Sequence, residues 1–391
     1  MVNVQTKVAK PPLFYGIIVF VFKESMSCLW RTIMYDIAIV GGGPAGSTLA
    51  RFLGRKYRIL LLERRTFREP IYSASQKCCG GLIAPDAQKM LASFGLGIPK
   101  SVILSPQLFA VRTIDLNNAL ERYYQRYYIN IDREEFDKWL ESIIPSEVNV
   151  INGCVYKSHQ EREDHVLLKY AVDGKEYEEK AGILVGADGA FSKVRRSSFS
   201  GQPCPKQYIS IQEWFETGDN LNYYGAIFDD EITDFYSWTI PKEDYLILGT
   251  ALTPDHNAYG KFELLKTKLK KYGYDFSRSV RKNGAFLLRP ERKSQICTGR
   301  GRIALVGEAA GFISPSSAEG LSYAFKSSLA LARAIKDGFE HWYELYNKNT
   351  VSLKRNITLK NLKSPVMYNG FLRNIAMRSG LMSISLESVE Y

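Results

Sequence analysis

The sequence is poor in the residues that build metal sites and disulfide frameworks. Its six cysteines, at positions 28, 78, 79, 154, 204 and 297, stand at irregular spacings with no CxxC pair, and its four histidines form no cluster beside them. Metal ligands recur at short, fixed spacings, so we expect no metal site. The thiols are those of a reduced, cytoplasmic protein in which most cysteines are structural.

Long hydrophobic runs are also scarce. The apolar run at 13–22 (LFYGIIVFVF) lies between Lys10 and Lys23 and is shorter than the roughly 20 residues that span a bilayer. The following KESMSCLW offers no small-residue cleavage site. We expect residues 1–33 to be an extension outside the fold, with a peripheral membrane anchor and a signal sequence as alternatives, and Met34 is a plausible start of the folded chain.

Low-complexity tracts and internal repeats are absent, which excludes disordered and solenoid proteins. The 391 residues are 45% hydrophobic and 24% charged, as expected of a globular chain with a large core. The net charge of +11 favours an anionic partner, such as a nucleotide, a phospholipid headgroup or nucleic acid. Because the charge is spread along the chain and no recognised motif accompanies it, we expect no nucleic-acid partner.

A glycine-rich turn with the spacing of dinucleotide-binding sites follows the first predicted strand. Residues 35–40 (YDIAIV) lead into GGGPAG and then into the helical stretch STLARFL. In this pattern Gly41 permits the tight turn, Gly43 lets the backbone approach a pyrophosphate, and Gly46 allows the helix to pack closely on the strand. The helix start, at Pro44 and Ala45, presents unpaired N–H groups to phosphate.

A second predicted strand completes the unit. Residues 58–62 (RILLL) end at Glu63, which lies about 20 residues after the glycines, where an acid accepts the hydroxyls of the adenosine ribose. Arg64 follows it and is included among the predicted cofactor-binding residues. Because strand, glycines, helix, strand and acid occur in order, the segment predicts a Rossmann-type βαβ unit rather than a glycine-rich surface turn.

Two segments far downstream favour FAD over a nicotinamide cofactor. Residues 182–196 (GILVGADGAFSKVRR) read as a strand that ends at Asp188 and Gly189, ahead of a basic helix. Residues 301–328 read as a strand that leads to a loop and a helix, whose N-terminus can face the flavin ring. The cofactor-binding residues predicted there are Gly307, Glu308, Gly311, Gly320 and Leu321.

The order of these segments resembles the FAD enzymes built like aromatic hydroxylases. The resemblance implies an α/β (α+β) fold, with a Rossmann-type FAD-binding domain and an inserted antiparallel-sheet substrate domain. It also implies that Glu308, where Asp is usual, reaches a ribityl hydroxyl, and that Arg133 lies near the pyrophosphate; a solvent-facing arginine at a helix start is the alternative. No second GxGxxG follows a strand, so we expect NAD(P)H or a reduced electron-carrier protein as a transient donor.

Two further segments resemble the geranylgeranyl reductase family. Residues 235–241 (FYSWTIP) are similar to its YxWxxP signature, and Lys77, Cys78, Cys79 and the glycine pair at 80–81 match a family loop in which Pro is usual at position 78. The similarity runs from about residue 34 to about 385 and is greatest to the bacterial colicin-M-resistance flavoproteins. It implies reduction of C=C bonds in an isoprenoid chain or prenyl lipid, with hydride from the reduced flavin.

Three side chains are predicted to serve this reaction. Tyr236 and Trp238 are two residues apart on a strand, so they share one face and present aromatic surface to an apolar substrate; a buried core pair is the alternative. Cys79 is predicted to position or protonate the substrate, with the charge of Lys77 favouring its thiolate. An ordinary loop cysteine is the alternative.

Two other functions stay open. The segment SWTIP is also similar to the WxWxIP of flavin halogenases, although Tyr236 replaces the first Trp, so a flavin monooxygenase or halogenase is one alternative. A non-catalytic flavin- or lipid-binding protein that protects envelope lipids is the other.

We expect the FAD-binding domain to comprise residues 34–75, 105–200 and 285–345. The substrate domain is expected at 76–104 and 201–284, with successive strands between 205 and 252. Residues 346–391 form a basic C-terminal helical segment that either lies on an anionic membrane or packs over the substrate domain. The protein is expected in the cytoplasm, with peripheral contact at the inner face of the membrane as a further expectation.

Overall fold

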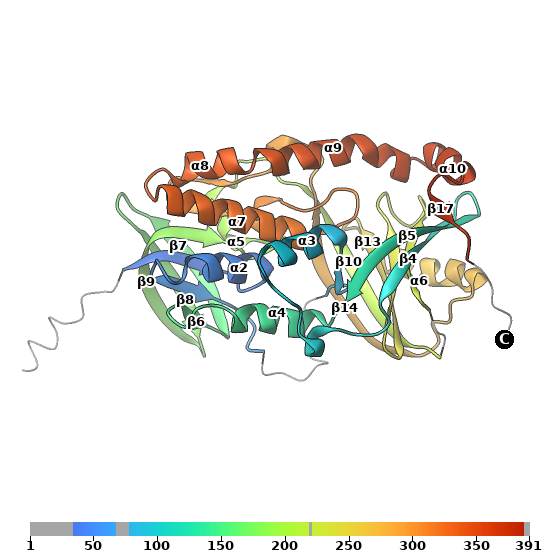
Figure 1. Cartoon of the computed structure of the whole chain (residues 1–391), viewed down its shortest axis with the longest axis horizontal. Coiled ribbons are helices and arrows are strands. Elements are labelled where there is room, and N and C mark those ends of the chain that lie inside the picture. Colours follow the sequence, from blue (N-terminus) through green and yellow to red (C-terminus); the bar gives the residue numbers. More distant parts are fainter. Residues whose placement is uncertain (1–33, 68–77, 219–220, 387–391) are drawn as a thin grey trace, which may run out of the picture.

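The computed structural model describes residues 34–67, 78–218 and 221–386. Two sheets lie end to end along the long axis of the molecule, and a layer of helices from the C-terminal third of the chain runs over both (Figure 1). The predicted extension at 1–33, and Lys77 in the loop ahead of the cysteine pair, lie outside the described residues.

The first sheet has the parallel core of a doubly wound fold. Its strands are β1 (Tyr35–Val40), β2 (Ile59–Leu62), β6 (Asn149–Ile151), β7 (Cys154–Glu161), β8 (Val166–Val172), β9 (Lys175–Gly186), β15 (Gly299–Arg300) and β16 (Ile303–Leu305). The order β6-β2-β1-β9-β16 is parallel, while β7 and β8 form an antiparallel extension on the first half of β9. Buried aliphatic runs such as IAIV and ILLL explain the central strands, because a parallel sheet is covered on both faces.

The second sheet is mostly antiparallel. Its strands are β3 (Leu82–Ile83), β4 (Leu108–Asp115), β5 (Leu120–Asn130), β10 (Lys206–Glu216), β11 (Tyr223–Phe228), β12 (Ser237–Lys242), β13 (Tyr245–Leu252), β14 (Ser279–Arg289) and β17 (Ser383–Ile384). They are ordered β14-β10-β13-β12-β11-β4-β5-β17, and β11 pairs with β4 in parallel. The strands expected between 205 and 252 are therefore confirmed, in one sheet.

Helices cover the sheets. They are α2 (Pro44–Leu53), α3 (Pro85–Ser93), α4 (Arg133–Ser142), α5 (Lys193–Ser198), α6 (Ala258–Leu269), α7 (Leu321–Asp337), α8 (Trp342–Asn349), α9 (Val351–Tyr368) and α10 (Gly370–Arg378). Figure 1 shows α7 beneath α8 and α9, with α10 over the far end of the second sheet. No helix in the described part of the chain is long and apolar enough to cross a membrane.

The division of the chain between the two sheets differs from the predicted domain boundaries. Residues 108–130, expected in the FAD-binding domain, form β4 and β5 of the second sheet, and β14 crosses the boundary expected at 285. Helix α3, expected in the substrate domain, packs with α4 and α7 in one buried cluster. The error has a physical cause, because β4 joins the sheet by pairing with a strand more than a hundred residues later, and local sequence patterns carry no information on such pairings.

Candidate functional site

The three motif glycines have distinct surroundings. Gly41 has φ +106°, and a Cβ on it would lie 2.5 Å from the carbonyl oxygen of Ala187. A Cβ on Gly46 would overlap the carbonyl of Gly41, which shows that helix and strand are packed as closely as the motif predicts. A Cβ on Gly43 would meet nothing within 4 Å. The space above Gly43 is thus free for a ligand to approach the backbone.

The start of α2 completes a cradle that fits a pyrophosphate. Pro44, Ala45 and Gly46 are buried, and no side chain of the described residues caps this helix terminus. The unpaired N–H groups and the positive end of the helix dipole therefore point into the space over Gly43. This donor set is the one that the phosphates of a dinucleotide require.

Glu63 lies at the end of β2 beside this cradle. Its side chain is buried, and its two oxygens accept hydrogen bonds from the backbone N–H of Gly42 at 2.7 Å and of Arg65 at 2.9 Å. Burial by itself would raise the pKa of Glu63, but the charge and hydrogen bonds of Arg65 lower it below its ordinary value. The carboxylate is thus held charged where the ribose hydroxyls are expected. Arg64 is exposed.

A buried chain of charges runs from Glu63 to the cysteine loop. Arg65 contacts Glu63 at 3.0 Å and Asp137 at 2.7 Å, and Arg133 contacts the other oxygen of Asp137 at 2.9 Å. Arg133 also donates to the Sγ of Cys79 at 3.2 Å. Arg133 is therefore not a solvent-facing helix-start residue; its side chain is 9% exposed. Arg65 and Asp137 were not among the predicted site residues, although the four-residue spacing of Arg133 and Asp137 on a helix is a signal for such a pair.

Lys242 is a second buried cation beside the same loop. Its ammonium donates to the carbonyls of Gly81 at 2.9 Å and Ile131 at 2.6 Å. Burial lowers the pKa of Lys242 to about 7, and Cys79, Asp132 and Glu243 oppose that shift. A lysine that ends an otherwise apolar strand was the available sequence signal for this residue.

The two neighbouring cysteines differ in their surroundings. The Sγ of Cys78 lies 3.7 Å from the carbonyl of Asn283, and burial raises the pKa of this thiol to about 12. Cys79 instead lies beside the guanidinium of Arg133 and within the electrostatic reach of Lys242. The structure therefore gives Cys79 two cations that the sequence analysis did not assign to it.

Tyr236 and Trp238 belong to an aromatic cluster between the second sheet and the loop that precedes α7. Their ring centroids are 5.5 Å apart, and both side chains are buried. Tyr236 donates to the carbonyl of Ser317 at 2.8 Å, and Tyr368 of α9 donates to that of Ser316 at 2.8 Å. The cluster also contains Phe228, Phe235, Ile240 and, at its margin, Leu82, Tyr128 and Tyr224. A Cβ on Gly80 would clash with Ile240, so the cysteine loop touches this cluster.

The remaining predicted cofactor residues lie at the carboxyl ends of β9 and β16. The carboxylate of Asp188 accepts from the N–H groups of Lys193 and Val194 and so caps α5, while burial raises its pKa against these hydrogen bonds. Gly189, Gly307 and Gly311 all have positive φ, as tight turns need.

Glu308 is tied to the second sheet through one of its carboxylate oxygens. Its Oε1 accepts from the backbone N–H of Leu288 at 3.0 Å, which ties this turn to β14 of the second sheet. Gly320 precedes α7 and Leu321 is its first residue, so both lie at the helix N-terminus as predicted. Glu319, which the sequence analysis did not single out, accepts from the N–H of Ser322 at 2.6 Å at this terminus.

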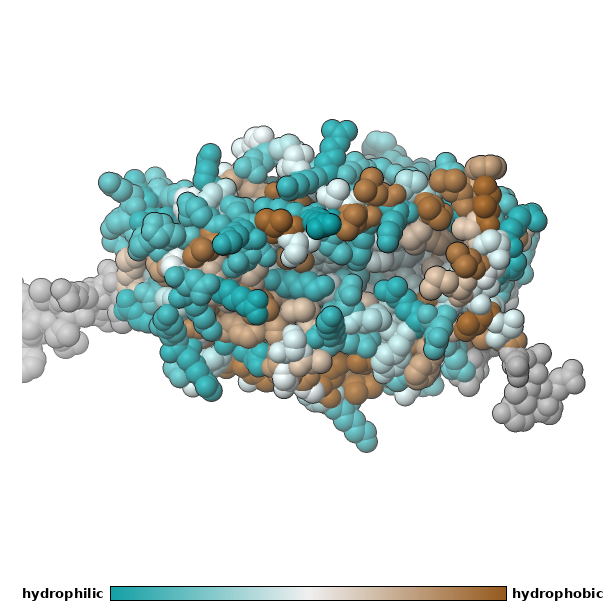
Figure 2. All heavy atoms as spheres, turned by 45° about the horizontal axis from the view of Figure 1, so that its top comes forward, coloured by the Kyte–Doolittle hydropathy of each residue, from teal (hydrophilic) through white to brown (hydrophobic). Residues whose placement is uncertain are grey.

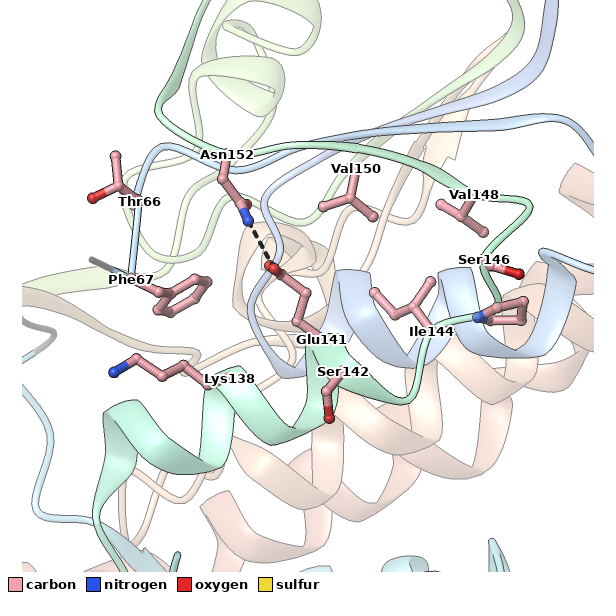
Figure 3. A pocket seen from close by; sticks show the side chains of 11 residues that line it. Thr66, Phe67, Lys138, Glu141, Ser142, Ile144, Ser146, Val148, Val150 and Asn152 are labelled. Atoms are coloured by element: carbon pink, nitrogen blue, oxygen red, sulfur yellow. Dashed lines mark hydrogen bonds between the residues drawn. The ribbon is translucent and has the colours of Figure 1, made fainter.

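A pocket of about 450 Å³ opens beyond Glu63, beside the residues that follow it (Figure 3). Asn152 donates to Glu141 at 2.7 Å across its floor, and burial raises the pKa of Glu141. The ring of Phe67 and the apolar side chains opposite can hold a flat ring. The pocket is lined by Thr66, Phe67, Lys138, Glu141, Ser142, Ile144, Pro145, Ser146, Val148, Val150 and Asn152.

Comparison with known proteins identifies relatives of this chain. The chain is 39% identical over 350 residues to Protein CbrA of Escherichia coli O9:H4 (strain HS), covering 90% of this chain and 94% of that protein. No family model matches.

Two solved structures share the fold. A geranylgeranyl bacteriochlorophyll reductase-like protein from Thermoplasma acidophilum superposes with a TM-score of 0.74 at 18% identity, covering 88% of this chain and 90% of that chain. CmlS, a flavin-dependent halogenase, superposes with a TM-score of 0.65 at 17% identity, covering 84% and 64%. The predicted fold class is thereby confirmed.

Proposed function

The chain belongs to the CbrA family, and from this premise we propose that it is an FAD-dependent oxidoreductase that reduces C=C bonds of an isoprenoid chain or prenyl lipid. The observation that carries the proposal is the placement of Cys79. This thiol lies at one end of a buried chain of charges that begins at the phosphate cradle, and its loop touches the aromatic cluster of Tyr236 and Trp238.

The cradle and its neighbours would hold the cofactor. Backbone N–H groups over Gly43 and at the start of α2 would bind the pyrophosphate, Glu63 the ribose, and the N-terminus of α7 at Gly320 and Leu321 the flavin ring. FAD, when bound and reduced by NAD(P)H or a carrier protein, supplies a hydride for one carbon of the double bond. The fold contributes orientation and exclusion of water.

Cys79 would supply the proton for the other carbon. The S–H bond breaks as the C–H bond forms, and the thiolate that is left is stabilised by the guanidinium of Arg133 and the ammonium of Lys242. One hydride and one proton together add two hydrogen atoms to the substrate. A prenyl chain would pack against this buried aromatic cluster.

The direct test is a single anaerobic turnover. The purified holoprotein is photoreduced, a geranylgeranyl lipid or polyprenyl phosphate is added, and flavin absorbance is followed together with the mass of the lipid. We expect reoxidation of the flavin with a gain of two hydrogen atoms in the lipid. A reduced flavin that reoxidises only with oxygen, and an unchanged lipid, would refute the reductase function.

A flavin monooxygenase or halogenase is the second candidate. The shared fold with CmlS and the SWTIP segment favour it, whereas Tyr236 in place of a tryptophan does not. Oxygen-dependent hydroxylation or halogenation of an added substrate would establish it. Tightly bound FAD that no reductant turns over would instead favour a flavin- or lipid-binding protein without catalysis.

A further inference from the structure

The C-terminal helices carry most of the exposed large hydrophobic side chains of the described residues. Twelve of the 21 such side chains belong to α9, α10 and the segment that follows. They gather toward one end of the face shown in Figure 2, over α10 and the end of α9. The twelve are Val351, Leu359, Leu362, Val366, Met367, Phe371, Leu372, Ile375, Leu381, Met382, Ile384 and Leu386.

The same segment is basic, and of its cations Arg373 pairs with Asp115 in the interior. Residues 345–386 contain seven lysines and arginines and no aspartate or glutamate. Arg355, Lys363 and Arg378 are exposed among the apolar side chains. Apolar side chains interspersed with cations are the composition that binds an anionic bilayer surface, because the side chains enter the headgroup region while the cations meet the lipid phosphates.

These helices are fixed on the protein by their opposite face. Arg373 is buried and pairs with the fully buried Asp115 of β4 at 2.7 Å, and Leu353 and Ile357 of α9 pack into the core of the first half. The exposed apolar side chains therefore belong to an ordered surface that faces away from the molecule. These side chains are not core-facing residues that became exposed when a helix detached from the protein.

The surface is joined to the aromatic cluster at the end of α9. Tyr368, the last residue of α9, contacts the rings of Phe228 and Phe235 and donates to the carbonyl of Ser316. Its neighbours Val366 and Met367 are exposed. The helix end thus belongs both to the outer apolar surface and to the aromatic cluster.

We propose that this C-terminal apolar surface, formed by Leu362, Val366, Phe371, Ile375, Leu381 and Met382, docks into the headgroup region of an anionic membrane and admits a prenyl lipid to the aromatic cluster past Tyr368. The lipid-delivery part rests on the proposed function, whereas the docking part stands on the surface itself. A surface that served only for pairing with a second copy would not need the exposed cations Arg355, Lys363 and Arg378, since two copies would bring like charges together.

Flotation of the holoprotein with lipid vesicles tests the docking. We expect binding to phosphatidylcholine vesicles that contain phosphatidylglycerol and little binding to phosphatidylcholine alone. Leu362→Asp with Phe371→Asp should weaken binding by about tenfold for each lost apolar side chain. Lys363→Glu with Arg378→Glu should weaken it by at least about fivefold for each charge and reduce its dependence on salt.

Tyr259→Asp is the matched control, because Tyr259 is 59% exposed but lies on α6, and its variant should bind vesicles like the parent protein. Equal binding to both kinds of vesicle, or to neither, would overturn the proposal. A dimer in light-scattering chromatography that Phe371→Asp dissociates, without vesicle binding, would assign the surface to a second copy. Vesicle binding with no lipid reduction would refute the proposed function but would still support the docking proposal.

Discussion

The hydroxyl of Tyr236, the residue that precedes β12, donates to the carbonyl of Ser317, 2.8 Å away in the loop that precedes α7. This bond joins the second sheet to the loop that presents the N-terminus of α7. The hydroxyl of Tyr224 lies 3.4 Å from that of Tyr236, and burial raises the pKa of both phenols far above neutral pH. Both groups are therefore uncharged and act by hydrogen bonding.

Tyr236→Phe should leave the carbonyl of Ser317 without its donor and lower the free energy of unfolding by about 1–3 kcal/mol. We expect a higher KM for the prenyl substrate as the loop loses its tether. Urea unfolding and steady-state kinetics measure the two effects. Tyr224→Phe is the control, because its longer contact should make both changes smaller; equal effects in the two variants would contradict the assigned role of the Ser317 bond.

Gly43→Val should weaken cofactor binding while the protein still folds. The added side chain meets no atom of the protein within 4 Å of its Cβ but enters the space expected for the pyrophosphate. We expect FAD affinity to fall at least about tenfold, the cost of one phosphate hydrogen bond. Gly46→Val should unfold the protein instead, because its Cβ would overlap the carbonyl of Gly41. Circular dichroism and flavin fluorescence separate the two outcomes.

Cys79→Ser should reduce kcat by about a hundredfold or more, since a hydroxyl is a far weaker acid than a thiol beside two cations. FAD content and thermal stability should not change. Cys78→Ser is the control, because burial keeps Cys78 a neutral thiol directed at the carbonyl of Asn283. If Cys79→Ser retains full activity, or if both variants lose it equally, Cys79 is not the proton donor.

Lys242→Met should change how stability depends on pH. The pKa of Lys242 is about 7 in the folded protein and about 10.4 in the unfolded chain. Between these values the unfolded chain holds a proton that the folded protein has released, so the free energy of unfolding of the parent rises with pH. Burial of Lys242 therefore lowers the free energy of unfolding by an amount of the order of 4–5 kcal/mol below pH 7. This penalty vanishes above about pH 10.4.

The methionine variant lacks this penalty, although it also loses two hydrogen bonds to carbonyls. Its stability relative to the parent should therefore be greatest at pH 6 and decline steadily towards pH 10, as measured by urea unfolding. Lys268→Met is the control: Lys268 pairs with Asp229 and Glu231 and its pKa is raised, so its contribution is constant over this range. A pH-independent difference for Lys242→Met would mean that this lysine stays protonated throughout.

The βαβ unit and the strands between 205 and 252 were predictable, because each depends on residues near in sequence. Gly41 and Gly46 are packed as closely as their spacing indicates. The buried chain of charges from Glu63 to Cys79, and the neighbouring Lys242, were not predictable in the same way. Arg65 contacts Asp137, and Lys242 contacts Gly81 and Ile131, and these partners are far apart in the sequence. The pairing of Arg133 with Asp137 and the lysine at the end of an apolar strand were the parts with a local signal.

The parallel pairing of β11 with β4 also determines when this chain can fold. Four strands of the first sheet, β6 to β9, lie in the sequence between these two partners, and both sheets are completed only by strands after residue 278. During synthesis, neither half can close on itself before most of the chain has left the ribosome, so contact order is high and folding is slow. The edge of β5 that pairs with β17 stays open longest, which makes C-terminal truncations of this chain prone to aggregate.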